Sequence, residues 1–429
     1  FKVDMDQTTK AFDKSRLESY LPLYYRKGVF PFKPYTNWLT YSKKPSEYFN
    51  LREFAFILEK DGDEKHLRYR SFTDSHEFEK ELCRYSPHKL DLGAVYNHPP
   101  KDGRNLPDFR AMEREFIFDI DLNDYDAVRK CCEGATVCAK CWKFIVMAVK
   151  ILDARLRKDF GYSALLYVFS GRRGVHCWVG DEKARKLTNQ ARSAFAEYLS
   201  LFEGSKMELR PTGKGKVKTT VHPMITDSYN VIMSAEGGRL VEEMVVEQRW
   251  LEKEEEALKD CRNPKLKEEL QRIFTLPKPE TRWKMLCIKC DEEAWRAERD
   301  KKMENLPETP SDEHRFFLLQ WVLSRLYPRL DVNVSTGVNH LLKSPFCIHP
   351  KTGNVAVPID PSEAHLFDVS RCPRVDLLLE ELGKEEKGGE GESKENKENR
   401  KILGYNHTSL KPYVETFEKF VEKTRKKKE

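Results

Sequence analysis

The chain has 429 residues, a net charge of only +6 and 11 cysteines. This length favours two domains, or one domain with an inserted subdomain, and the small net charge means that a polyanion must be bound by local clusters. The sequence contains no run of 18 apolar residues and begins without the apolar core of a signal peptide, so we expect no membrane partner. The odd number of cysteines favours thiols or metal ligands in a reducing compartment. Because the first residue is not Met, we expect the natural N-terminus to precede it.

Taken in chain order, the first predicted elements are an amphipathic helix at 16–25 and a hairpin of strands at 52–59 and 66–72 around an Asp-Gly turn. A strand, a glycine-bounded turn and a second strand follow at 164–180. Residues 183–327 have helical periodicity and no convincing strand. This pattern predicts a mostly helical insertion between two parts of an α/β domain.

The later part of the chain predicts an alternating strand at 329–335, a disordered charged loop at 384–400 and a terminal helix at 410–423. The boundaries that follow are a discontinuous α/β (α+β) core at 1–200 and 311–429 and a helical inserted subdomain at 201–310.

Two acids interrupt the apolar segment "EFIFDIDL", which we predict to be a strand with Asp119 and Asp121 on one face. Two carboxylates placed this way repel each other unless a cation lies between them, and Mg²⁺ or Mn²⁺ suits carboxylate oxygens. Asp331 in the predicted strand at 329–335 could be a third ligand. The alternative, that all three acids are solvated side chains on strand faces, stays open.

Cations and imidazoles gather in two motifs that could bind phosphate. The turn "SGRRGVH" presents Ser170, Arg172, Arg173 and His176 around glycines, and guanidinium forks match phosphate oxygens. The segment "GVNHLLKSPFCIHPKTG" then adds its own set, which consists of His340, Lys343 and His349. A hairpin tip with solvated arginines is the alternative interpretation of the first motif.

Four cysteines occur close together in "CCEGATVCAKC", namely Cys131, Cys132, Cys138 and Cys141. The last two have the two-residue spacing that zinc sites favour, so we predict a closed structural zinc site. Cys287 and Cys290 share that spacing, but no second pair accompanies them. We expect free thiols there.

Taken together, the motifs "REFAF", "DLGAVYNHPP", "FDIDLNDYD", "CC…CAKCW", "SGRRGVHCWV", "PRLDVNVS" and "NHLLKSPFCIHPKTG" closely resemble the catalytic small subunit of the eukaryotic DNA primase, a member of the archaeo-eukaryotic primase superfamily. The resemblance implies a mixed-sheet catalytic core with a helical inserted subdomain and a structural Zn²⁺. It also implies an enzyme, a nucleotidyltransferase, that makes short RNA primers on single-stranded DNA.

The resemblance assigns site residues by position. It places two divalent ions, Mg²⁺ or Mn²⁺, on Asp119, Asp121 and Asp331, and a catalytic acid on Glu53. The implied nucleotide-binding residues are Arg68, Asp91, Ser170, Arg172, Arg173, His176, His340, Lys343 and His349. Where the family has lysine in this motif the chain has Thr336, so one phosphate contact is expected to be absent.

The implied partners are an iron–sulfur large subunit of primase, the replicative DNA polymerase alpha complex, a single-stranded DNA template and ribonucleoside triphosphates. A nuclear location is implied as well. The sequence alone leaves two other functions open. They are a repair-type polymerase of the same superfamily and a non-catalytic, zinc-stabilised module that binds nucleic acid.

Overall fold

The structure is a computed structural model that describes residues 11–60, 63–203, 206, 207, 209, 221–301, 306–388 and 404–425. The chain divides into two compact units. The first comprises Phe1–Asp119, Gly161–Glu197 and Asp331–Glu429, and the second comprises Ile120–Phe160 and Tyr198–Leu330. The insertion predicted at 201–310 falls within the second unit, which also takes in residues 120–160.

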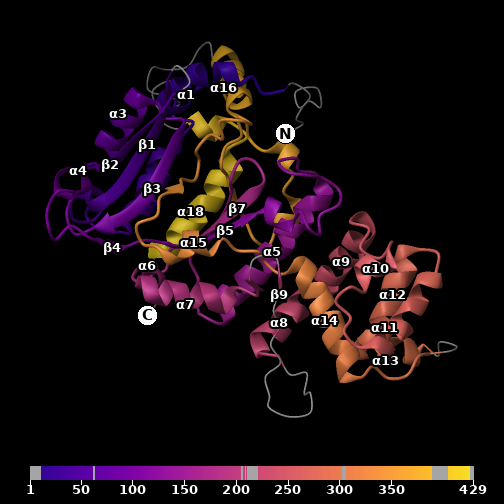
Figure 1. The fold of residues 1–429 in the computed structure, drawn as a ribbon. Coiled ribbons are helices and arrows are strands. Elements are labelled where there is room, and N and C mark those ends of the chain that lie inside the picture. The colour runs from indigo at the N-terminus through magenta and orange to yellow at the C-terminus, as the bar shows by residue number, and fades with distance from the viewer. Residues whose placement is uncertain are drawn as a thin grey trace. The chain divides into compact units, whose positions relative to one another are not determined.

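One sheet of the first unit has the strand order β10-β3-β1-β2, with β4 also paired to β3 (Figure 1). All of its pairs are antiparallel, and its strands are β1 (Arg52–Lys60), β2 (Asp63–Arg70), β3 (Lys89–Tyr96), β4 (Ala111–Glu113) and β10 (Leu342–Lys343). The predicted hairpin is confirmed as β1 and β2, although the turn residues 61–62 lie outside the described residues. Asp91 is paired directly with Lys343, so their side chains share one face of the sheet.

The second sheet has the order β11-β6-β7-β5. Its strands are β5 (Phe116–Asp121), β6 (Leu165–Phe169), β7 (Gly174–Val179) and β11 (Pro358–Ile359). The strand, turn and strand predicted at 164–180 are confirmed, since β6 and β7 form an antiparallel hairpin. The alternation predicted for β5 is confirmed too, because Phe118 and Ile120 are fully buried whereas Asp119 and Asp121 are half-buried.

Helices complete the first unit and supply its aromatic core. They are α1 (Leu17–Arg26), α2 (Phe32–Thr40), α3 (Ser75–Tyr85), α4 (Pro100–Gly103), α6 (Glu182–Arg185), α7 (Asn189–Leu199, which begins in this unit), α15 (Val332–Thr336), α16 (Val375–Gly388) and α18 (Lys411–Arg425). Trp38 of α2 meets Trp178 of β7 and Phe417 of α18 edge-on, each with ring centroids 5.6 Å apart. These contacts tie the C-terminal helix to the second sheet. Both terminal helices match their predictions.

The strand predicted at 329–335 is wrong. Val332–Thr336 forms the short helix α15, and Asp331 is its N-cap, with the side chain accepting a hydrogen bond from the Asn333 N–H at 3.0 Å. An Asp side chain that satisfies a free N–H in this way favours a helix start over an extended ladder. The Ser335 hydroxyl donates to the Ile117 carbonyl at 2.7 Å, which holds α15 against β5.

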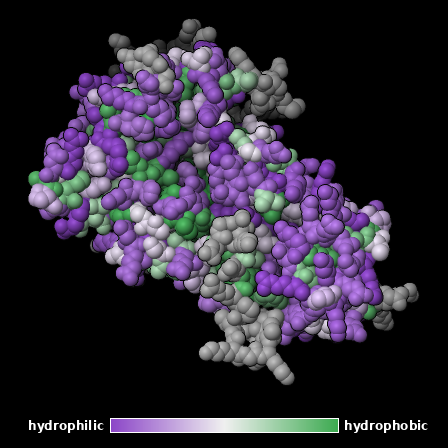
Figure 2. Space-filling view, in the orientation of Figure 1, coloured by the Kyte–Doolittle hydropathy of each residue, from purple (hydrophilic) through white to green (hydrophobic). Residues whose placement is uncertain are grey.

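The second unit is mostly helical, as predicted for the insertion. Its helices are α5 (Ala139–Lys158), α8 (Pro223–Ile232), α9 (Ala235–Glu247), α10 (Glu254–Ala257), α11 (Pro264–Gln271), α12 (Pro279–Cys290), α13 (Glu292–Asp300) and α14 (Asp312–Leu326). Trp321 lies between Trp250 and Trp283, with ring centroids 6.0 and 5.6 Å away. Over α11 to α13 the face drawn in Figure 2 is mainly hydrophilic, and α13 buries none of its side chains.

Two further expectations need correction. The segment 183–327 does contain strands, since β8 (Phe202–Glu203) pairs with β9 (Lys206–Met207). In the charged segment 384–400, residues 384–388 belong to α16 because Glu and Lys are good helix formers. The rest of that segment lies outside the described residues. None of the described helices combines the length and the apolar composition that crossing a bilayer requires.

Candidate active site

Asp119 and Asp331 are brought together in the first unit. The Asp331 N–H donates to the main-chain carbonyl of Asp119 at 3.2 Å, and Asp331 then begins α15. The His176 Nε2 on the neighbouring strand β7 lies 3.5 Å from Asp119 Oδ1. Asp121 follows on β5, where its Oδ1 accepts the Asn123 N–H at 2.9 Å. Carboxylate oxygens of this kind fit Mg²⁺ or Mn²⁺.

The turn between β6 and β7 is shaped by glycine. Gly171 has φ +89°, a conformation that L side chains rarely adopt, and a Cβ there would lie 2.8 Å from the Cβ of His349. The Gly174 N–H donates to Ser170 Oγ at 3.1 Å. The turn that carries Arg172 and Arg173 can therefore approach His349 only because residue 171 lacks a side chain.

Lys343 and His349 close over this turn from the C-terminal part of the chain. Lys343 Nζ donates to the Ser170 carbonyl at 2.9 Å, and Thr352 Oγ1 donates to the Gly171 carbonyl at 2.8 Å. Two sets of residues that are about 170 positions apart thus form one cationic cluster. The predicted phosphate-binding residues Ser170, Lys343 and His349 are brought together.

Burial tunes the ionisation of this cluster. It lowers the pKa of Lys343 to about 8 and, with the nearby charges of Lys343 and Arg172, lowers the pKa of His349 to about 3. His349 is consequently neutral at physiological pH and can bind phosphate only as a hydrogen-bond donor. Burial also raises the pKa of Asp91, which faces Lys343 across the β3–β10 pair.

Glu53 lies beneath Arg68. Its side chain is fully buried, and Oε1 accepts hydrogen bonds from Arg68 Nε at 3.1 Å and from the Tyr69 N–H at 3.3 Å. The Tyr96 hydroxyl donates to Oε2 at 3.1 Å. These contacts make Glu53 a positioning residue for Arg68 in this structure, whereas its predicted catalytic role stays a prediction.

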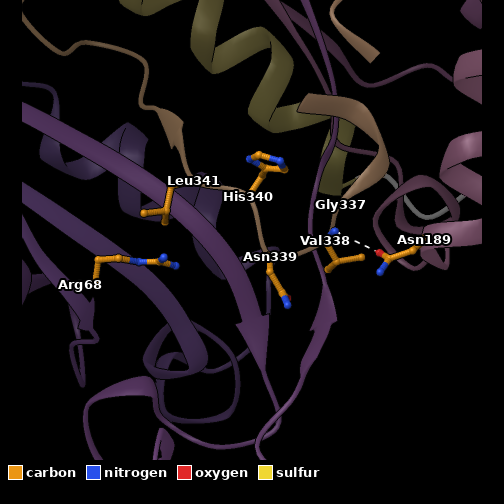
Figure 3. Close-up of a pocket in the computed structure, with 7 residues that line it drawn as sticks. All are labelled: Arg68, Asn189, Gly337, Val338, Asn339, His340 and Leu341. Atoms are coloured by element: carbon orange, nitrogen blue, oxygen red, sulfur yellow. Dashed lines mark hydrogen bonds between the residues drawn. The ribbon is translucent and has the colours of Figure 1, made fainter. Parts of the chain in front are cut away.

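An open pocket of about 480 Å³ lies beside Arg68 (Figure 3). Its lining consists of Arg68, Asn189, Gly337, Val338, Asn339, His340 and Leu341. Arg68 and His340 were predicted from the resemblance, but Asn189 and Asn339 were not. A surface Asn gives no sequence signal of its own, so only the fold places these two amides in a pocket.

The cysteine prediction corresponds to a compact cluster in the second unit. The ligand atoms of Cys131, Cys132, Cys138 and Cys141 all lie within 4.8 Å of one another, and in the described parts of the chain no other group of potential metal ligands is as compact. Cys138 Sγ is 3.7 Å from Cys131 Sγ and 3.9 Å from Cys141 Sγ. A tetrahedral site with Zn–S bonds of about 2.3 Å requires sulfurs roughly 3.8 Å apart.

Other properties of the cluster also fit a metal. Burial raises the pKa of the Cys131, Cys132 and Cys141 thiols to about 11, so a bound cation is needed to hold them as thiolates. The Gln248 side chain donates to Cys131 Sγ at 3.4 Å, a contact that the sequence did not reveal. Such a hydrogen bond orients a ligand sulfur. The cluster could hold zinc.

Carboxylates beside an imidazole, together with cations gathered at a glycine turn, form a site that suits phosphate groups. Comparison with known proteins makes this specific. The family model described as DNA primase small subunit matches residues 118–361. The chain belongs to the family of eukaryotic DNA primase small subunits, as its motifs predicted.

Three relatives show how far the likeness extends. The DNA primase small subunit of Caenorhabditis elegans is 48% identical over 96% of this chain and 98% of its own length. That of Saccharomyces cerevisiae is 38% identical over 84% and 85%, and that of Drosophila melanogaster is 34% identical over 97% and 94%. The likeness therefore covers both units.

Proposed function

We propose that the chain is the catalytic subunit of a DNA primase, a DNA-directed RNA polymerase that synthesises short RNA primers on single-stranded DNA for replication. The observation that carries the proposal is the Lys343–Ser170 contact, which gathers phosphate-binding groups in a chain of this family. A nucleotidyltransferase needs positioned cations because the charge of the transferred phosphoryl group must be neutralised.

The carboxylates of Asp119, Asp121 and Asp331 would hold two Mg²⁺ or Mn²⁺ ions. When bound, such ions neutralise triphosphate charge and lower the pKa of the attacking 3′-hydroxyl. Two observations support this role. The main-chain bond between Asp331 and Asp119 holds their backbones together, and the cap bonds of Asp121 and Asp331 each orient a carboxylate before any ligand arrives.

The chain's own residues bind and orient the triphosphate. Arg172 and Arg173 offer guanidinium forks, Lys343 offers an ammonium group, and neutral His349 donates a hydrogen bond. His176 lies close enough to Asp119 to orient that carboxylate as well as to contact a phosphate. Arg68, Asp91, Ser170 and His340 complete the proposed nucleotide site.

Zn²⁺ on the four cysteines would be structural. Four thiolates leave no open position for substrate, and the site includes the start of α5, whose N-cap is Cys138 and whose first turn contains Cys141. We propose further that the subunit works in the nucleus with an iron–sulfur large subunit and the polymerase alpha complex. The words "small subunit" in the names of the relatives support a larger assembly.

A synthesis assay without a primer tests the proposal. The full chain is incubated with a homopolymer DNA template, labelled ribonucleotides and Mn²⁺, and short RNA products are expected. Extension of supplied ends without new chains would indicate a repair-type polymerase. Template binding with no nucleotide incorporation, with or without the large subunit, would indicate a non-catalytic module.

A further inference from the structure

A strained turn at 344–347 lies between Lys343 and His349 in the chain. Its last residue donates an N–H hydrogen bond to the carbonyl of its first residue at 3.4 Å. The second residue is Pro345, and the third, Phe346, has φ +64°. Proline followed by a positive φ is the pattern of a type II turn, in which the third residue is normally Gly or Asn. A bulky side chain at this position carries backbone strain that Gly would not.

Phe346 is held in this conformation through both of its main-chain polar groups. Its N–H donates to the Ala356 carbonyl at 2.7 Å, and its carbonyl accepts a hydrogen bond from the Tyr24 hydroxyl at 2.9 Å. Its ring is fully buried and meets Phe417 edge-on, with centroids 5.1 Å apart. A strained φ persists only where the surrounding structure fixes it in several ways. Tyr24 supplies a side-chain part of that support.

Two tyrosines of the N-terminal helices contact the turn. Tyr24 of α1 and Tyr35 of α2 are both fully buried, and the Tyr35 hydroxyl forms a hydrogen bond with Ser344 Oγ. Burial raises the pKa of both phenols well above the usual range, so both stay protonated and Tyr24 stays a donor. The helix predicted at 16–25 therefore does more than fill the core.

The turn determines where Lys343 and His349 lie. Lys343 comes directly before it, and its Nζ donates to the Ser170 carbonyl. His349 comes two residues after it and lies against Gly171. The sign of φ at Phe346 sets the direction in which the chain leaves the turn. The two residues can therefore keep their present spacing only while that φ stays positive.

We propose that Tyr24 is a positioning residue for the triphosphate, because its hydroxyl holds the strained turn and the turn holds Lys343 and His349 in the phosphate cluster. Tyr35, bonded to Ser344, is the second support. This role rests on the proposed function, since it takes the cluster as the place where the triphosphate of an incoming nucleotide binds. It also gives the N-terminal helices a part in substrate binding that no contact with the substrate requires.

The test is the variant Tyr24→Phe, with Tyr25→Phe as its matched control. Each variant keeps the ring and removes a buried hydroxyl of α1 that donates to a main-chain carbonyl, at 2.9 Å for Tyr24 and at 3.1 Å for Tyr25. The acceptor of Tyr25 is Pro87, which precedes β3 and lies outside the turn. Urea denaturation should therefore show a similar, small fall in the unfolding midpoint for both variants.

Nucleotide binding should separate the two variants. Fluorescence anisotropy measures binding of a labelled ribonucleoside triphosphate to the full chain in the presence of Mn²⁺. Tyr24→Phe should weaken binding roughly tenfold, because a displaced Lys343 loses a hydrogen bond to a charged phosphate. Tyr25→Phe should bind the nucleotide as the wild type does.

The Lys343 ammonium gives a second readout that needs no ligand. Burial lowers the pKa of this group to about 8. The ionisable groups around it are Asp91, Lys89, Cys347 and Cys372. A relaxed turn would expose the ammonium to water, so its pKa should rise by roughly one unit in Tyr24→Phe and stay unchanged in Tyr25→Phe. Reaction with acetic anhydride over a series of pH values, followed by mass spectrometry of the Lys343 peptide, measures this pKa.

Three results would overturn the role of Tyr24. They are wild-type nucleotide binding by Tyr24→Phe, an unchanged Lys343 pKa in that variant, and equal losses of binding in both variants. If Tyr24→Phe does not fold, Tyr35→Phe removes the bond to Ser344 instead and has the same expected results. Because the lysine pKa is measured without nucleotide or synthesis, a chain that makes no primers would sink the proposed function and still report on the turn.

Discussion

Lys343 Nζ donates to the carbonyl of Ser170 at 2.9 Å, although the two residues are 173 positions apart in the chain. This contact joins the glycine turn of the β6–β7 hairpin to β10 of the other sheet. The ammonium group is partly buried there, and this burial lowers the pKa of Lys343 to about 8. The electrostatics of the proposed phosphate site therefore depend on a group that titrates close to physiological pH.

The first prediction follows from that pKa. Lys343 is charged below about pH 8 and neutral above it, so affinity for a ribonucleoside triphosphate should fall as the pH rises from 7 to 9. Lys343→Arg should remove this dependence because a guanidinium stays protonated. Nucleotide binding measured at a series of pH values checks both statements. An equally steep fall in the arginine variant would show that another group is responsible.

Gly171 supports a second prediction. Its φ is +89°, and a Cβ at this position would lie only 2.8 Å from His349, so Gly171→Ala must strain the turn or displace His349. We expect the free energy of unfolding to fall by about 1–3 kcal/mol and nucleotide affinity to fall with it. Urea denaturation and nucleotide titration measure the two effects.

The control for this change is Gly383→Ala in α16, where a Cβ would meet no atom within 4 Å. Replacing a helical Gly by Ala without a steric clash should raise the free energy of unfolding by about 1 kcal/mol. If both variants had wild-type stability, the conformational argument at Gly171 would be incorrect.

Arg114 supports a prediction about the stability of the protein. It is buried, burial lowers its pKa to about 9, and its bond to the Gly337 carbonyl is its one described side-chain hydrogen bond. Arg114→Met keeps the volume and removes a desolvated charge, so the free energy of unfolding should stay within about 1 kcal/mol or rise. Urea denaturation measures the change, and a much larger loss of stability would contradict the argument that the buried charge is costly.

Cys138→Ser tests the zinc site. With one thiolate gone, zinc content by metal analysis and the melting temperature should fall together, because a closed structural site contributes directly to folding. Cys287→Ser, which alters the other pair of cysteines at two-residue spacing, should keep full zinc content. Full zinc content in Cys138→Ser would overturn the site.

Much of the core could be predicted from local patterns. Alternation placed Asp119 and Asp121 on one face of β5, and the glycine-bounded turn predicted the β6–β7 hairpin. The segment around Asp331 misled the same reasoning, because alternating valines also fit a one-turn helix once Asp331 caps it. Local periodicity cannot show whether a side chain will form a cap bond. It therefore cannot decide between strand and helix where the residues suit both conformations.

Long-range contacts lay beyond the sequence. Nothing near Glu53 shows that it is buried under Arg68, and nothing near Arg114 indicates that it reaches Gly337, 223 positions away. Such contacts depend on how sheets and loops close over each other. The sequence also could not show that residues 120–160 group with the predicted insertion, because this grouping depends on packing between α5 and the later helices.

The most direct test of the central claim is primer-free RNA synthesis by Asp119→Ala beside the wild-type chain, on a homopolymer DNA template with Mn²⁺. Far-UV circular dichroism first confirms that both proteins are folded. The account predicts labelled RNA chains from the wild type, none when the divalent ions are chelated, and none from Asp119→Ala under any condition. RNA synthesis by Asp119→Ala at the wild-type rate would contradict it.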